Sequence, residues 1–147
     1  TMTHGTSENT TSTDYQDSSV TDSITPASSS NTVLILCGVP NYCTKSGSGG
    51  AATKTRMKIA LYRGTASGTL IQELAVGNNL PASGSPTETG YTMETMATFA
   101  IIDSPSTTSA QTYTMCWKAF DNQTAYVNND YGSDAVSNMV LMEIDGT

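Results

Sequence analysis

Charged residues make up only 13% of this 147-residue chain, and basic residues are especially scarce. Six lysines and arginines stand against thirteen aspartates and glutamates, no two of the six are adjacent, and the net charge is −7. Binding to nucleic acid needs clustered Lys and Arg that displace the counterions of the phosphates, so the composition argues against it. Apolar runs are also short. None approaches the roughly 20 residues that span a bilayer, and we expect no membrane insertion.

Histidine and cysteine are nearly absent. The single histidine, His4, lies in a polar leader, where it cannot serve as the base of a serine triad or complete a zinc site. No two carboxylates stand together in a pattern that favours acid–base catalysis. We therefore expect no enzymatic activity, no catalytic residue and no cofactor. The three cysteines, Cys37, Cys43 and Cys116, cannot all pair within one chain, which predicts at least one buried thiol; a Cys37–Cys43 link is the alternative.

The segment "NNDYGSD" suggests one metal alternative. Asp130 and Asp134 follow Asn128 around Gly132, and alternating oxygen ligands around a glycine can wrap Ca²⁺. The segment lacks the bidentate glutamate that usually closes such a loop. A solvated loop is therefore the simpler interpretation, with Ca²⁺ near Asp130 and Asp134 as the alternative.

Serine and threonine are abundant, with 18 Ser and 25 Thr. Threonine favours pleated surfaces and serine clusters favour turns, which together indicate an all-β fold with long polar loops. A disordered or O-glycosylated stalk has similar composition. That alternative suits the first twelve residues and fails wherever apolar runs recur.

Alternating and short apolar runs predict about eight strands and no helix. This pattern favours an antiparallel β-sandwich, and a jelly roll in particular. We expect residues 1–13 to be a flexible or docked arm and residues 14–147 to be one domain, with loops at 41–55 and 77–90. The expected strands are a weak one within 15–26, then 32–39, 57–64, 69–77, 91–102, 111–120, 124–128 and 138–144.

The period-two pattern also predicts which side chains of each strand share one face. These are Met57, Ile59, Leu61, Leu70, Leu74, Val76, Tyr91, Met93, Ala97, Phe99, Ile101, Tyr113, Met115, Trp117 and Ala119.

Three segments are apolar on both faces: Val33–Leu36, Phe99–Ile102 and Met139–Met142. Each sheet of a lone sandwich has one face in water, so these segments need a second cover. A contact with another copy of the chain supplies it, while capping by loops or by the arm is the alternative. The candidate residues for a subunit interface are Leu34, Leu36, Phe99, Ile101 and Leu141.

Five segments occur in an order that resembles a known module. They are "SITPASSSNTVLIL", "LYRG", "FAIIDSPSTTSAQTYTM", "AYVNN" and "VSNMVLMEI". This order is similar to a module of marine and cyanobacterial tailed-phage proteins, found in tail fibres and other virion surface proteins. It covers roughly residues 15–145, and Ile102 departs from the Leu that the module usually carries before Asp103. The resemblance implies a jelly roll similar to the heads of complement C1q or tumour necrosis factor, assembled as a homotrimer.

The resemblance implies a virion surface protein made in the cytoplasm of a host bacterium. The first hypothesis is a trimeric capsid decoration or cement protein that contacts the major capsid protein or other virion proteins. The short arm favours this role over a fibre, provided that the chain is complete. The second is a tail-fibre or knob tip that binds a glycan or protein of the host surface, with Tyr42, Asn79, Tyr126 and Tyr131 as candidate contacts. The third is a monomeric carbohydrate-binding module, in which exposed aromatic rings would form a coplanar strip.

Overall fold

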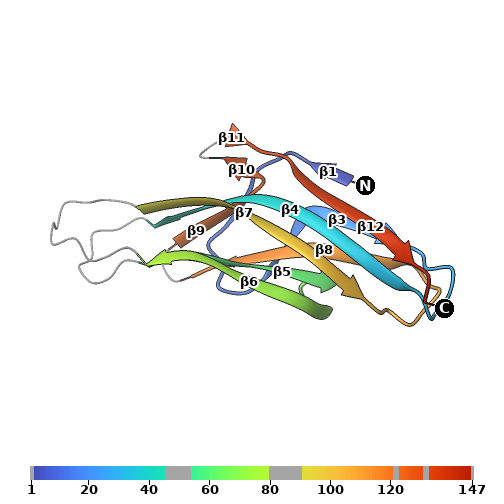
Figure 1. Cartoon of the computed structure of the whole chain (residues 1–147). Coiled ribbons are helices and arrows are strands. Elements are labelled where there is room, and N and C mark those ends of the chain that lie inside the picture. The colour runs from blue at the N-terminus through green and yellow to red at the C-terminus, as the bar shows by residue number, and fades with distance from the viewer. Residues whose placement is uncertain (1, 46–53, 80–90, 121–122, 131–132, 147) are drawn as a thin grey trace.

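The chain is built almost wholly from antiparallel strands (Figure 1). The computed structural model describes residues 2–45, 54–79, 91–120, 123–130 and 133–146. The strands are β1 (Met2–His4), β2 (Glu8–Thr10), β3 (Gln16–Ile24), β4 (Thr32–Lys45), β5 (Lys54–Arg63), β6 (Thr69–Asn79), β7 (Tyr91–Asp103), β8 (Gln111–Ala119), β9 (Gln123–Val127), β10 (Asn129–Asp130), β11 (Ser133–Asp134) and β12 (Ser137–Ile144). Among these described residues, no helix is long and apolar enough to cross a membrane.

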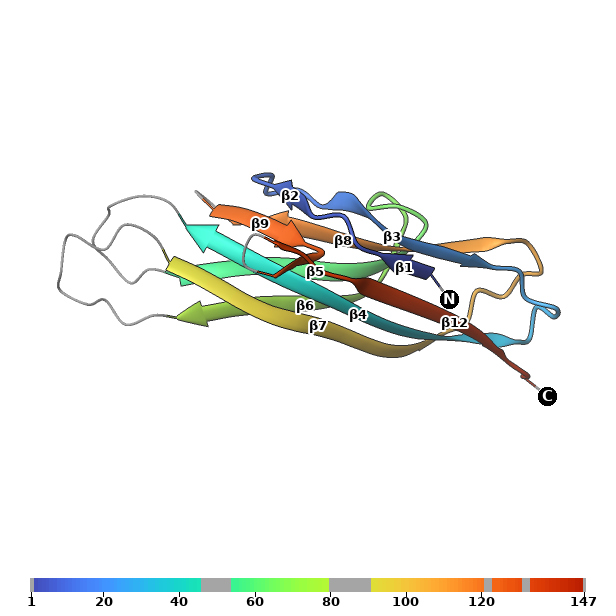
Figure 2. The ribbon, with the colours of Figure 1, turned by 90° about the horizontal axis from the view of Figure 1, so that it is seen from above.

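Two sheets face each other across the core, as the views in Figures 1 and 2 show. Within the described residues, the front sheet has six strands: β1, β12, β4 and β7 lie in that order, and β9 and β2 extend the sheet from the part of β4 that β12 leaves unpaired. The back sheet has β3, β8, β5 and β6 in that order. The pairs β1 with β12, β3 with β8, β4 with β7 and β5 with β6 are nested within one another along the chain. This nesting is the pairing of a jelly roll, so the predicted fold class is confirmed.

The long strand β4 lies at the centre of the front sheet and pairs with three other described strands. One of its edges pairs with β7 over the whole length of the strand, from Val33 to Lys45. Its other edge is shared: β12 pairs with residues 32–38 and β9 pairs with residues 41–45. The sheet therefore has two regions along β4, one beside β12 and one beside β9.

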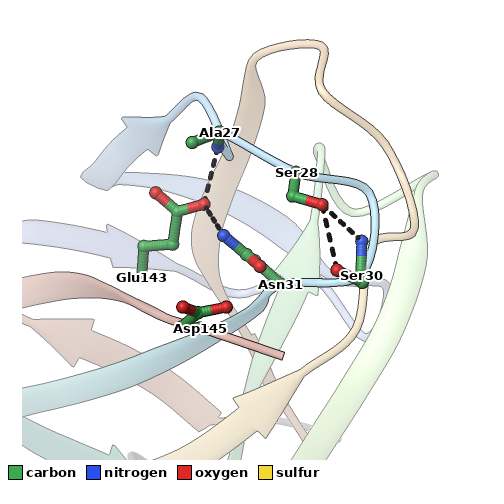
Figure 3. Close-up of a pocket in the computed structure, with 6 residues that line it drawn as sticks. All are labelled: Ala27, Ser28, Ser30, Asn31, Glu143 and Asp145. Carbon is green, nitrogen blue, oxygen red and sulfur yellow. Dashed lines mark hydrogen bonds between the residues drawn. The ribbon is translucent and has the colours of Figure 1, made fainter. Parts of the chain in front are cut away.

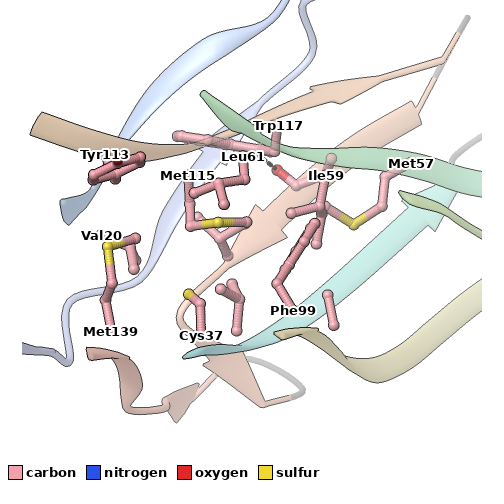
Figure 4. Packing of buried hydrophobic residues seen from close by; sticks show 14 of the residues in the cluster. Val20, Cys37, Met57, Ile59, Leu61, Phe99, Tyr113, Met115, Trp117 and Met139 are labelled. Carbon is pink, nitrogen blue, oxygen red and sulfur yellow. Dashed lines mark hydrogen bonds between the residues drawn. The ribbon is translucent and has the colours of Figure 1, made fainter. Parts of the chain in front are cut away.

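The core between the sheets follows the predicted alternation (Figure 4). Met57, Ile59 and Leu61 of β5 are fully buried, as predicted. The same holds, within a few per cent of exposed surface, for Tyr113, Met115, Trp117 and Ala119 of β8. The buried indole of Trp117 is satisfied, because Nε1 donates to the carbonyl oxygen of Ala125 at 3.3 Å.

Strand β6 departs from the predicted pattern. Leu70 is 48% exposed, whereas Ile71, Leu74 and Val76 pack against the core. The register shifts between Leu61 and Tyr62, which pair with Gln72 and Leu70, so one extra residue bulges out of β6. A bulge reverses the alternation beyond it, and the prediction that Leu70 shares a face with Leu74 and Val76 is wrong for this reason.

The predicted loop 41–55 is also partly wrong. Strand β4 continues to Lys45 and β5 begins at Lys54, so only residues 46–53 lie between them and these are outside the described residues. Asn41, Tyr42 and Cys43 pair on both sides, with β7 and with β9. Long-range pairing thus extends the strand through a segment whose polar composition resembles a turn. The predicted second loop, 77–90, begins three residues too early, because β6 continues to Asn79.

The N-terminal segment lies against the chain's own sheets. Strand β1 pairs with β12, and β2 pairs with β9, so the segment covers the front-sheet edge that is opposite β7 (Figure 2). A polar cluster holds it there. The side chain of Asn128 donates to the carbonyl oxygen of Thr6 at 3.0 Å, and Ser137 donates to Asn128.

The segment then crosses to the back sheet. The backbone N–H of Ala119 donates to the carbonyl oxygen of Ser12 at 2.8 Å. Tyr15 lies over the outer face of the back sheet, with its ring centroid 5.6 Å from that of Tyr62, and its hydroxyl donates to Glu73. Lys58 bonds the same carboxylate, and hydrogen bonds from Lys58 and Tyr15 hold the pKa of Glu73 below its ordinary value.

All three cysteines are free, buried thiols. Cys37 and Cys43 both point inward from β4, and six residues of one extended strand separate their backbones by roughly 20 Å. The alternative of a Cys37–Cys43 link is therefore wrong. Burial raises the pKa of Cys37 to about 12 and that of Cys43 to about 11, and it also raises the pKa of Cys116.

Candidate functional site

The outer face of the front sheet carries rows of side chains that cross β12, β4 and β7. Their register follows from the pairing of the three strands, because directly opposite residues share a face. Two rows are apolar and a third is small and polar. They are Met142–Leu34–Ile102, Val140–Leu36–Ala100 and Asn138–Gly38–Thr98.

We call the apolar part of this face the apolar outer patch. It consists of Leu34, Leu36, Met96, Ala100, Ile102, Val140 and Met142. Ile102 is 60% exposed, Met96 58%, Met142 51% and Leu36 39%. None of these residues is charged, in a chain whose net charge is −7. Large apolar side chains gathered on one open face are typical of an interaction surface.

The predicted interface residues are divided between the two faces of the sheet. Leu34 and Leu36 belong to the apolar outer patch. Phe99 is only 4% exposed and is part of the core, and Ile101 and Leu141 pack against the core as well. These three face the back sheet, so the prediction that their side chains meet another subunit is corrected here.

Five residues of the patch were not among the predicted interface residues: Met96, Ala100, Ile102, Val140 and Met142. Their signal was present in the sequence, because each is an even-numbered position on a strand whose odd-numbered positions face the core. The sequence could not show whether the odd or the even positions face outward within a run that is apolar at every position.

The N-terminal segment leaves the apolar outer patch open. It lies along the edge formed by β12 and β9 and then crosses to the back sheet. The high exposure of Ile102 and Met142 shows that no described loop buries them. Capping by the arm or by the described loops is therefore not what covers the segments that are apolar on both faces.

An aromatic pair occupies the other end of the same face. Tyr42 of β4 lies directly opposite Tyr126 of β9, with 5.4 Å between ring centroids and 52° between ring planes. Both are half-buried and lie on strands; the sequence predicted a strand around Tyr126 and a loop at Tyr42. Of the other two candidate contacts, Asn79 is the last residue of β6 and its side chain is outside the described part. Tyr131 is also outside it.

The rim of the sandwich contains a small polar pocket, drawn in Figure 3. The carboxylate of Glu143 accepts hydrogen bonds from the side chain of Asn31 and from the backbone N–H of Ala27, both at 2.6 Å. These bonds hold the pKa of Glu143 below its ordinary value. Asp145 and Ser30 also line the pocket. Its groups bind one another, and the carboxylate serves to fix the turn that begins β4.

The proposed calcium alternative finds no ligand set among the residues that the structure describes. No group of three or more His, Cys, Asp or Glu side chains comes together in that part of the chain. Asp134 lies in the short strand β11, and its carboxylate accepts the backbone N–H of Ser7 at 3.0 Å. Asp134 therefore helps to hold the N-terminal segment.

Comparisons with known proteins add little to this picture. No protein-family model matches the chain, and no curated protein matches it. Among solved structures, the chain is similar to a chain in the structure of infectious bursal disease virus, Gx strain, with 13% identity and a TM-score of 0.29. The similarity covers 95% of this chain and 36% of the viral chain.

Proposed function

We propose that this chain is a non-enzymatic structural protein of a virion surface, assembled as a trimer that decorates a phage capsid. The single observation that carries the proposal is the apolar outer patch, an uncharged and open sheet face on an acidic jelly roll. The resemblance of five ordered segments to a module of tailed-phage surface proteins supports the phage setting.

The absence of charge on this patch allows a second copy to be the partner. Copies with a net charge of −7 repel each other, and the repulsion is weakest where the contacting surfaces carry no charge. The two apolar rows of the patch satisfy this condition. Burial of apolar surface stabilises the contact by about 25 cal/mol for each Å² removed from water. The patch points outward from a rigid sheet, so a closed ring of three copies can form without changing the fold.

Light scattering on the purified chain tests the trimer. Three copies of 15.4 kDa weigh about 46 kDa, and we expect this mass. Ile102→Asp combined with Met142→Asp places charge on the patch, and we expect a folded monomer. Leu70→Asp is the matched control, because Leu70 is similarly exposed but lies on β6 of the back sheet. A wild-type mass near 15 kDa would overturn the trimer.

Binding assays then separate the two virion roles. We expect the trimer to bind empty capsids of the phage that encodes it and to leave host cells unlabelled. If the protein instead labels host cells and does not bind capsids, the chain is a fibre or knob tip. The third hypothesis, a monomeric carbohydrate-binding module, required a coplanar aromatic strip. Tyr42 and Tyr126 are tilted by 52° and do not form one.

A further inference from the structure

The aromatic pair on the front sheet is the centre of a mixed row of side chains. Four strands contribute one residue each, and the register places them in the order Asn9, Tyr126, Tyr42 and Glu94. Directly opposite residues on neighbouring strands have Cβ atoms about 4.5–5.5 Å apart, so the four side chains form one continuous strip. We propose that this tyrosine row is a binding site for an uncharged sugar residue of a glycan.

The two tyrosines provide the apolar contact that a sugar needs. The C–H groups of a pyranose ring form an apolar face, and an aromatic ring is its usual partner because the ring is large, rigid and flat. Tyr42 and Tyr126 are half-buried, so each keeps part of its surface open while its neighbours hold its orientation. Both rings stand on paired strands of the sheet, which fixes their positions before any ligand binds.

The ends of the row provide hydrogen-bonding groups for the sugar hydroxyls. Asn9 and Glu94 are exposed and lie on either side of the tyrosine pair. An amide both donates and accepts, and a carboxylate accepts from two hydroxyls at once. The next row on the same face, Thr124–Thr44–Thr92, adds three hydroxyls. An apolar centre with a few polar groups around it is the usual composition of a small-molecule site.

The tilt of the rings limits the size of the site. With 52° between their planes, Tyr42 and Tyr126 cannot both stack flat against successive sugars of an extended chain. One ring can stack on a single pyranose while the other contacts its edge. The site therefore recognises one sugar residue, such as a branch or a chain end.

Charge determines which sugars fit. Among the described members of the two rows, the only charged side chain is the carboxylate of Glu94, and the chain as a whole is strongly acidic. Sialic and uronic acids are disfavoured by this charge. Neutral hexoses and N-acetylhexosamines remain as the matching class.

The tyrosine pair lies beyond the end of the apolar outer patch. Leu36 is six positions before Tyr42 on β4, roughly 20 Å along the strand, while Met96, the patch residue nearest to the row, is two positions from Glu94 on β7. A subunit contact centred on Leu34 and Leu36 therefore leaves the tyrosine pair open for a sugar. The proposal does not depend on the trimer, and a failure of one leaves the other in place.

Saturation-transfer NMR and calorimetry with the full chain test the proposal. The probes are maltotriose, mannotriose and tri-N-acetylchitotriose at up to ~10 mM, since single sugar contacts give dissociation constants in the millimolar range. We expect at least one probe to bind, and 3′-sialyllactose not to bind. Absence of binding by all three neutral probes would overturn the proposal.

Variants locate the site and separate stacking from folding. We expect Tyr42→Ala and Tyr126→Ala to weaken binding at least tenfold, while Tyr42→Phe stays within about threefold of wild type. Asn9→Ala, at an exposed position of an edge strand, weakens binding about threefold or more without altering thermal unfolding. Tyr15→Phe, on the back sheet, is the control and binds as wild type does. Binding that survives both alanine changes would place the sugar elsewhere and refute the site.

Discussion

The side chain of Asn31 donates from Nδ2 to the carboxylate of Glu143 at 2.6 Å, and this bond joins the turn before β4 to the end of β12. The same carboxylate accepts the backbone N–H of Ala27. The start of β4 and the end of β12, which pair with each other, are thereby held in register at the rim (Figure 3).

Glu143 makes stability depend on pH. Its hydrogen bonds lower the pKa of Glu143 in the folded state below the ordinary value of 4.5. The stabilisation is complete above that ordinary value and is lost as the pH falls through the lowered one. Glu143→Gln should therefore lower the melting temperature at pH 7 and approach the wild type towards pH 3. Asp14→Asn is the control, because Asp14 bonds Ser12 through backbone atoms. A Glu143→Gln deficit that is the same at both pH values would contradict this role.

Neighbouring residues of β4 should respond differently to truncation. Ile35 is fully buried in the core, and Ile35→Ala should lower the free energy of unfolding by about 2–5 kcal/mol. Leu36 is 39% exposed on the outer face, and Leu36→Ala should cost under about 1.5 kcal/mol. Urea unfolding measures both in the monomeric Ile102→Asp, Met142→Asp background, where no second copy covers the patch. Equal losses would mean that the two side chains are buried alike.

Asn128 should control the attachment of the N-terminal segment. Its backbone has φ of 56°, a left-handed conformation that Asn tolerates better than most residues, and its side chain donates to Thr6. Asn128→Ala loses the bond and adds strain, at a cost of about 1–3 kcal/mol. Limited proteolysis should then cut within residues 1–13 faster than in the wild type. Asn138→Ala, at an exposed position of β12, should leave the cutting rate unchanged.

The thiols should be inert in the folded protein. Burial raises the pKa of all three cysteines, so the reactive thiolate is scarce at pH 8 as well as shielded. A chromogenic disulfide reagent should titrate no thiol before unfolding and three thiols per chain in denaturant. Rapid reaction of one thiol in the native protein would show that its strand opens locally.

The sequence predicted the sandwich well because alternation is a local property. The buried faces of β5 and β8 follow directly from period-two patterns at Met57–Leu61 and Tyr113–Ala119. Where a run is apolar at every position, as in Val33–Leu36, no alternation of apolar and polar residues distinguishes the two faces of the strand. The sequence then could not show which residues face outward, and Phe99 was assigned to the wrong side for the same reason.

Long-range pairing determined what the sequence could not predict. The end of β4 is a strand because β7 and β9 supply partners to Asn41–Lys45, and neither partner is adjacent in the chain. The bulge that exposes Leu70 is a misfit between two strands and leaves no local signature. The ring contact between Tyr42 and Tyr126 also depends on long-range pairing, since it forms only when β9 pairs with β4.

The shared edge of β4 also governs when the sheet can form. Strand β12 follows the other described strands in the sequence and lies between β1 and β4, so β1 has no place in the sheet until residues 137–144 have left the ribosome. Until then one half of a long apolar edge stays unpaired, and such edges recruit other chains. A nascent copy is therefore most vulnerable to aggregation just before residues 137–144 emerge, and a truncation before Ser137 should yield insoluble protein.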